Sequence, residues 1–179
     1  MLLKNTKERY GYIAMVLHWL IALIIIGMLC VGIYMVRLPI SLEKLKLYGM
    51  HKEVGFLVLL LVILRLEWRL TNRVPALPDT MPTWQKWAAH GSHILLYLFM
   101  FAMPITGWLL TSAAGLPVSF FGLFVIPTII PANPTWLMVF TYIHHWLGFS
   151  LIALLMVHTA AALQHHFIDK DTILRRMLP

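Results

Sequence analysis

Long apolar stretches alternate with short polar segments along the whole chain. A bilayer core of about 30 Å needs about 20 apolar residues in a helix, and four stretches meet this requirement. We expect transmembrane helices at about residues 12–36, 54–70, 91–111 and 136–167. The pattern predicts an all-α fold, an integral membrane four-helix bundle that forms one domain over residues 1–179.

Composition supports a membrane protein and excludes a soluble domain, because 60% of the residues are hydrophobic, 12% are charged and the mean hydropathy is +0.81. The first apolar stretch is too long for a signal peptide and no A-x-A-like site follows it, so we expect it to remain in the mature protein. Cys30 is the single cysteine of the sequence, and C-x-x-C-H does not occur. An intrachain disulfide and a covalently attached c-type haem are therefore excluded.

The net charge of +7 is distributed unevenly between the two predicted faces. The face holding both termini and the turn after the second helix carries Lys4, Lys7, Arg9, Arg65, Arg69, Arg73, Lys86, Lys170, Arg175 and Arg176. The other face carries Arg37, Lys44, Lys46 and Lys52. By the positive-inside rule, both termini are predicted to be cytoplasmic. The membrane topology accounts for the positive net charge, so the charge does not indicate a nucleic-acid partner.

Residues 113–143 contain no lysine or arginine, and they include Pro117, Pro127, Pro131 and Pro134 among apolar residues. Proline at this density interrupts helices. We therefore expect a re-entrant or interfacial cap on the outer face rather than a fifth span.

Four histidines lie in or beside the predicted spans: His18, His51, His144 and His158. Ionisable residues in hydrocarbon are costly, and those on inward faces of a bundle usually mark a functional site. The predicted helix directions place His18 and His158 near the cytoplasmic side, and His51 and His144 near the outer side. Two pairs result, one in each leaflet.

Helix periodicity separates the histidines of the last helix. His144 and His158 are fourteen residues apart, close to four full turns, so they share a face at about 21 Å along the axis. His165 continues this face at the cytoplasmic edge. His145 is turned away by about 140°, and His166 by about 80°.

Paired imidazoles in an apolar cleft suit haem iron, which accepts axial histidines. Zinc or iron transport sites more usually include carboxylates or thiolates, although metal transport by this row of histidines remains an alternative. Two axial histidines leave no open position for oxygen, so electron transfer is the expected work. The simpler alternative is that these histidines are interhelical hydrogen-bond partners. For His90, His93 and His145 the preferred interpretation is an interfacial residue, whereas His165 or His166 is a candidate contact for a substrate headgroup.

The chain resembles the bacterial cytochrome b561 family of small four-helix membrane cytochromes. The matching segments are E-R-Y-G-Y-I-A-M-V-L-H-W-L at residues 8–20, M-H-K-E-V-G at 50–55, A-A-H-G-S-H-I-L-L-Y at 88–97, and the run from His144 through His158 to H-H-F-I-D-K-D at 165–171. Together they cover almost the whole length. They are also similar, more distantly, to the b-type cytochrome subunits of nickel-iron hydrogenases and formate dehydrogenases.

The resemblance implies two b-type haems in a multi-pass protein of the bacterial inner membrane. It assigns His18 and His158 to the iron of a cytoplasmic-side haem, and His51 and His144 to that of an outer haem. It also implies a quinone near the inner haem, with His165 as its contact. A family member oxidises superoxide and passes the electron to ubiquinone, but where that member has a small hydroxyl residue, this chain has Val16.

The resulting hypothesis is an oxidoreductase that moves electrons from an outer one-electron donor, such as superoxide, to membrane ubiquinone. The basic residues at positions 37, 44, 46 and 52 either steer an anion inward or simply form a solvated loop. The alternative function is a non-catalytic haem anchor and electron conduit for a partner dehydrogenase or hydrogenase. The sequence leaves the oligomeric state open.

Overall fold

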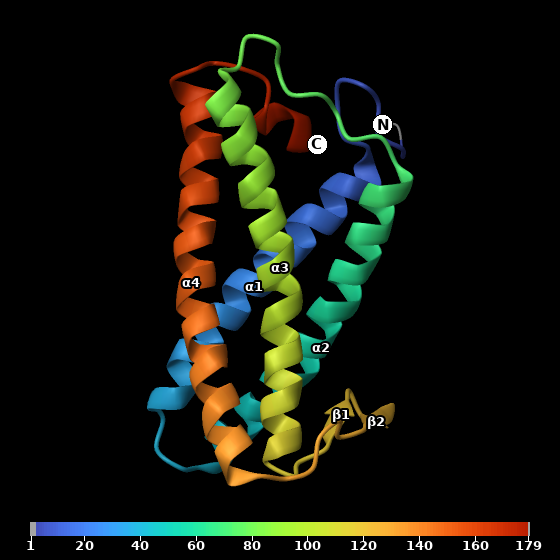
Figure 1. Cartoon of the computed structure of the whole chain (residues 1–179). Coiled ribbons are helices and arrows are strands. Elements are labelled where there is room, and N and C mark those ends of the chain that lie inside the picture. The colour runs from blue at the N-terminus through green and yellow to red at the C-terminus, as the bar shows by residue number, and fades with distance from the viewer. Residues whose placement is uncertain (1–2, 179) are drawn as a thin grey trace.

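The computed structural model describes residues 3–178, which form a bundle of four long helices with a small hairpin at one end (Figure 1). In chain order the elements are α1 (Tyr12–Arg37), α2 (Leu42–Thr71), α3 (Thr83–Ala113), β1 (Val118–Phe120), β2 (Phe124–Ile126), α4 (Pro134–Phe167) and the 3₁₀ turn η1 (Leu174–Met177). The chain is therefore mostly helical, as the hydrophobic pattern predicts.

Two helices begin earlier than the hydrophobic stretches indicate. The sequence predicts starts near residues 54 and 91, whereas α2 begins at Leu42 and α3 at Thr83. At the start of α2, the Ser41 side chain accepts a hydrogen bond from the Lys44 backbone N–H, which satisfies one of the free donors of the first turn. The length of an apolar stretch indicates only the part of a helix that lies in hydrocarbon. The helical hydrogen bonds of α2 and α3 also include polar turns that precede this part.

Three helices, α1, α3 and α4, are long and apolar enough to cross a membrane. Among the described residues α2 is a fourth long helix that does not meet the same criterion, because its uncharged run lies only between Glu53 and Arg65. Length and composition therefore support a membrane span for three of the four predicted helices, α1, α3 and α4. α2 packs against both α1 and α3.

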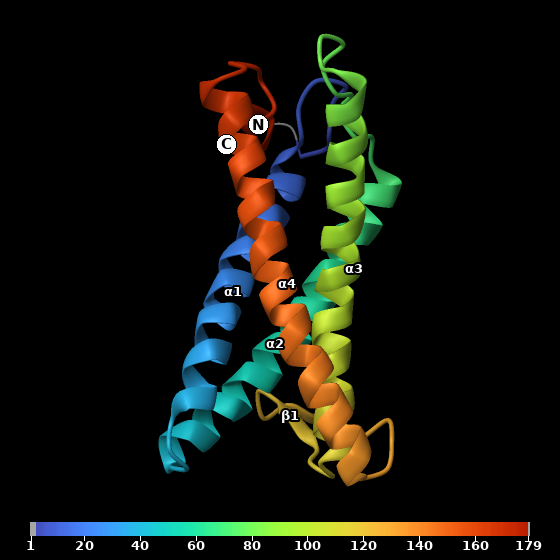
Figure 2. The same ribbon diagram turned by 60° about the vertical axis from the view of Figure 1, so that its left-hand side comes forward.

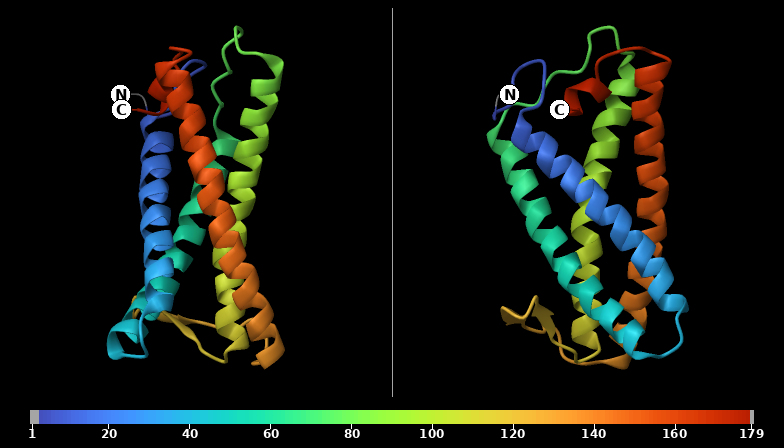
Figure 3. Two further views of the ribbon diagram at one scale, coloured as in Figure 1. Left: turned by 90° about the vertical axis from the view of Figure 1, so that its left-hand side faces the viewer. Right: turned by 180° about the vertical axis from the view of Figure 1, so that it is seen from behind.

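The helices are inclined to one another (Figures 2 and 3) and pack around a small apolar core. All four contribute to this core, which consists of Ile21, Ile25, Val58, Val62, Leu96 and Leu151. Large apolar side chains also lie outside, among them Leu23, Met156 and Val157. An apolar outer surface is what a membrane-embedded bundle presents to lipid.

Both ends of the described chain lie at the same end of the bundle (Figure 1). The Trp19 indole N–H donates to the Met177 carbonyl at 2.7 Å, and the Arg9 guanidinium donates to the Leu178 carbonyl at 2.7 Å. These bonds hold η1 beside the start of α1. The basic residues of the two terminal segments are therefore gathered at one end.

The opposite end carries an antiparallel hairpin of β1 and β2 that the sequence analysis does not predict. Its turn is made by Phe121 and Gly122, both with positive φ, and the Leu123 N–H donates to the Phe120 carbonyl. The Phe120 ring lies 6.4 Å from that of Phe56 on α2. The proline-rich stretch thus forms a compact cap, but α4 begins within it, at Pro134.

We expect Leu151→Ala to destabilise the bundle by about 2–5 kcal/mol, because the 2% exposed side chain lies in the core and its loss leaves a cavity. Leu163→Ala on the same helix is the matched control, since Leu163 is 44% exposed. Unfolding in mixed micelles with increasing dodecyl sulfate measures the difference. Equal midpoints for the two variants would contradict the core described above.

Candidate functional site

The four histidines singled out from the sequence lie in two pairs between helices. The rings of His18 on α1 and His158 on α4 have centres 6.3 Å apart. The rings of His51 on α2 and His144 on α4 are also 6.3 Å apart. The structure therefore brings together the residues that depth and helix rotation paired, and α4 contributes one ring to each pair.

A hydrogen-bond chain on α3 orients His144. The Thr106 hydroxyl donates its single proton to the Met103 carbonyl at 2.9 Å, and its oxygen lies 3.1 Å from His144 Nδ1. With that proton already used, the Thr106 oxygen accepts from Nδ1–H. The remaining nitrogen, Nε2, then keeps its lone pair for a metal ion, an arrangement typical of ligating histidines.

Two glycines leave room for the rings of this pair. A Cβ atom at Gly107 on α3 would lie 3.2 Å from His144 Cε1, and one at Gly32 on α1 would lie 3.4 Å from His51 Cε1. The contact at Gly107 is tighter than a Cβ usually makes, whereas the one at Gly32 is an ordinary van der Waals distance. His51 Nδ1 is buried and has no hydrogen-bond partner among the described residues.

A cavity of about 540 Å³ surrounds this pair, with side chains of all four helices and Val118 of the hairpin in its wall. Its volume lies within the range of about 300–1,000 Å³ typical of sites for cofactors and other small molecules. Arg37, Lys52 and His145 also border it. The sequence places His145 on another face, and the residue is indeed exposed, but it also borders the cavity.

A third ring joins the other pair. The sequence predicts that His93 is an interfacial residue, but its ring on α3 lies 5.7 Å from that of His158 inside the bundle. Its neighbour His90 is exposed and its Nδ1 lies 2.6 Å from the Lys86 carbonyl, as suits an interfacial residue. Four residues beyond His93, Tyr97 lies on the same helix face. The four-residue spacing of His93 and Tyr97 is the feature of the sequence that could have indicated an inward-facing His93.

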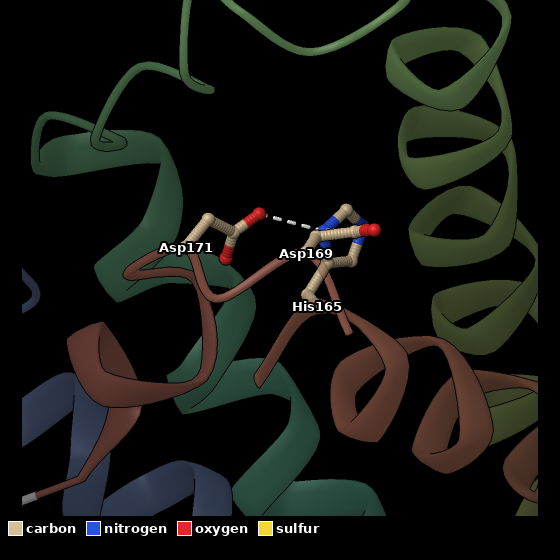
Figure 4. A group of neighbouring side chains, drawn as sticks. All are labelled: His165, Asp169 and Asp171. Carbon is tan, nitrogen blue, oxygen red and sulfur yellow. Dashed lines mark hydrogen bonds and ion pairs between the residues drawn. The ribbon is translucent and has the colours of Figure 1, made fainter. Parts of the chain in front are cut away.

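His165 lies near the end of α4 in a cluster with two acids (Figure 4). Its Nδ1 is 2.7 Å from an Asp171 carboxylate oxygen and 3.2 Å from one of Asp169. The ligand atoms of the three residues lie within 4.8 Å of one another, close enough to share a metal ion. The hydrogen bond between His165 Nδ1 and Asp171 explains the close contact without a metal ion. It leaves Nε2 as the other ring nitrogen of His165 for a further contact.

The paired rings fit haem iron. Two imidazoles on opposite faces of one metal ion, with metal–nitrogen bonds of about 2.0 Å, have ring centres about 6 Å apart. Both observed pairs have this separation, and the cavity around His51 and His144 is lined by none of the carboxylates or thiolates that other metals prefer, among the described residues.

Comparison with known proteins agrees with this chemistry. Residues 9–179 match the family model of prokaryotic cytochrome b561. The chain is 39% identical over 176 residues to cytochrome b561 homolog 2 of Escherichia coli K12, covering 97% of this chain and 93% of that protein. It is 34% identical over 131 residues to cytochrome b561 homolog 1 of the same organism, covering 72% of this chain and 73% of that protein.

A more distant relative bears a functional name. The chain is 25% identical over 184 residues to the probable superoxide oxidase CybB of Yersinia pestis, covering 96% of this chain and 97% of that protein. The family model spans most of the sequence, and the two Escherichia coli proteins are each more than 30% identical to it. The chain therefore belongs to the prokaryotic cytochrome b561 family, whose members are membrane proteins that bind b-type haem and transfer electrons.

Proposed function

We propose that the protein holds two b-type haems and carries electrons across the bacterial inner membrane from an outer donor to ubiquinone. His51 and His144 hold one haem, and His18 and His158 hold the other. A haem iron with two imidazole ligands supplies reversible one-electron transfer. The observation that carries the proposal is the occurrence of two imidazole pairs, each with ring centres 6.3 Å apart.

The proposed orientation rests on charge. Both terminal segments and the loop after α2 lie at one end of the bundle. Counted with the adjoining turns of α2 and α3, this end carries ten of the 14 lysines and arginines, so it is assigned to the cytoplasm. The hairpin end then faces outward. In this arrangement α2 crosses the membrane beside α1 and α3, with its uncharged run at the bilayer centre.

Superoxide is the proposed outer donor. Arg37 and Lys52 line the cavity that contains His51 and His144, and their charges attract a small anion toward it. Lys44 is less available, because its ammonium donates to the Leu38 carbonyl at 2.7 Å. The name of the Yersinia pestis relative also supports this donor.

Ubiquinone is the proposed acceptor at the cytoplasmic end. Two superoxide ions each lose one electron and become O₂, and ubiquinone gains two electrons and two protons to become ubiquinol. His165 is the candidate contact for the quinone carbonyl. Its bond to Asp171 fixes the ring and leaves Nε2 to face a substrate.

Replacing His158 with alanine is expected to remove one haem and leave the other, because each pair depends on its own residue of α4. The wild type should contain two haems per chain. A pyridine haemochrome assay with protein quantification measures the ratio. His145→Ala is the neighbouring control and should retain both haems; an unchanged ratio in His158→Ala would refute the assignment.

Gly107→Ala is expected to disturb the outer haem selectively, because the new Cβ would lie 3.2 Å from His144 Cε1 and push the ring. Gly91→Ala on the same helix meets no atom within 4 Å and is the matched control. A redox titration followed by visible absorption should show a shifted potential or a lost component for Gly107→Ala alone. Identical titrations for both variants would argue against a haem beside Gly107.

Stopped-flow mixing tests the donor and the acceptor together. Purified protein with a soluble ubiquinone analogue should consume superoxide faster than the spontaneous rate, with quinol formed in proportion. Arg37→Gln and Lys52→Gln should slow this reaction at low salt more than at high salt, because steering is screened by ions. Absence of quinone-dependent consumption would exclude superoxide while leaving the haem assignment untouched.

A further inference from the structure

The cytoplasmic histidine pair is surrounded by a basic cluster that lacks a counter-ion. Its members are Arg65 and Arg69 on α2 and Tyr97 on α3. Arg65 lies near enough to His18, His93 and His158 to act electrostatically on each imidazole, and Arg69 acts likewise on His93. The Arg69 guanidinium carbon is 5.7 Å from the centre of the Tyr97 ring. Two positive charges therefore adjoin three imidazoles inside the bundle.

No acid balances these charges within the part of the chain that the structure describes. The ion pairs found there involve only His165, and neither arginine has a carboxylate within 4.0 Å. A guanidinium carries five N–H donors, yet Arg65 makes one long bond, of 3.4 Å, to the Ala14 carbonyl. A charge in an apolar setting without a partner is strongly unfavourable.

Tyr97 gives an independent sign of a missing ligand. Its buried hydroxyl lies beside the Arg65 guanidinium, which can only donate to it, so the hydroxyl proton has no acceptor among the described residues. Buried polar atoms are nearly always bonded, so one left over beside an unpaired arginine indicates a group that accepts from both. That acceptor must be anionic to offset the arginines.

We propose that Arg65, with Arg69 and Tyr97, binds a propionate carboxylate of the haem held by His18 and His158. This inference rests on the proposed function, since it requires a haem at that pair. A b-type haem carries two carboxylates, and guanidinium groups bind carboxylates with paired N–H donors. The cluster thereby fixes the rotation of the haem about the axis joining the imidazoles and stabilises its reduced form.

Holoprotein variants test the assignment by redox titration and resonance Raman spectroscopy of the propionate bending band. Arg65→Gln removes the charge, and Arg65→Lys keeps it. Arg73→Gln, an exposed arginine just beyond the end of α2, is the matched control. Tyr97→Phe removes only a hydroxyl, and it tests the same contact if the Arg65→Gln protein fails to accumulate.

Arg65→Gln should shift the potential of one haem to a more negative value, because a nearby cation disfavours the more positive ferric state. The affected haem should be the one that His158→Ala removes. Arg65→Lys should keep the potential closer to that of the wild type. Both Arg65→Gln and Tyr97→Phe should move the propionate band, whereas Arg73→Gln should change neither signal.

Two results would overturn the inference. Unchanged potentials and an unchanged propionate band in Arg65→Gln and Tyr97→Phe would show that the cluster does not contact the haem. A shifted potential with an unchanged band would mean that another anion, such as a lipid phosphate, occupies the cluster. A wild-type protein that purifies without haem would instead refute the proposed function.

Discussion

Imidazole rings paired edge to face between helices are the constraint on which the rest of the structure depends. Each pair joins different helices, so the backbones must approach closely while the rings stay in an apolar setting. Glycine eases this approach at Gly107, where a Cβ would lie only 3.2 Å from His144 Cε1. The Thr106 hydroxyl donates its proton to the Met103 carbonyl on the same helix. Its oxygen therefore accepts from His144 Nδ1–H, which fixes the His144 tautomer.

α4 links the two halves of the molecule, because it supplies His144 to one pair and His158 to the other. α1 and α2 run in opposite directions and bring His18 and His51 to opposite ends of the bundle. The polar environment of the two ends also differs. His51 and His144 adjoin a cavity that Val118 of the hairpin helps to line, whereas His18 and His158 adjoin Arg65.

Periodicity and apolar length predicted the helices themselves well, because a membrane imposes a strong and regular pattern. The starts of α2 and α3 were placed too late, since their first turns are polar and lie beyond the apolar stretch. The hairpin was missed because its strands are only three residues long and its turn depends on positive φ at Phe121 and Gly122. Such short pairing leaves little trace in a hydrophobic pattern.

The sequence by itself determined the membrane class, the helical periodicity and the placement of His144 and His158 on one face, because these depend on residues near one another in the chain. Only the tertiary structure decided that His93 joins His158, that Arg65 lies beside three imidazoles and that Asp171 holds His165. Those contacts depend on which helix faces meet and on how the chain turns after α4. Interhelical geometry of this kind is set by packing of the whole bundle, and no local pattern encodes it.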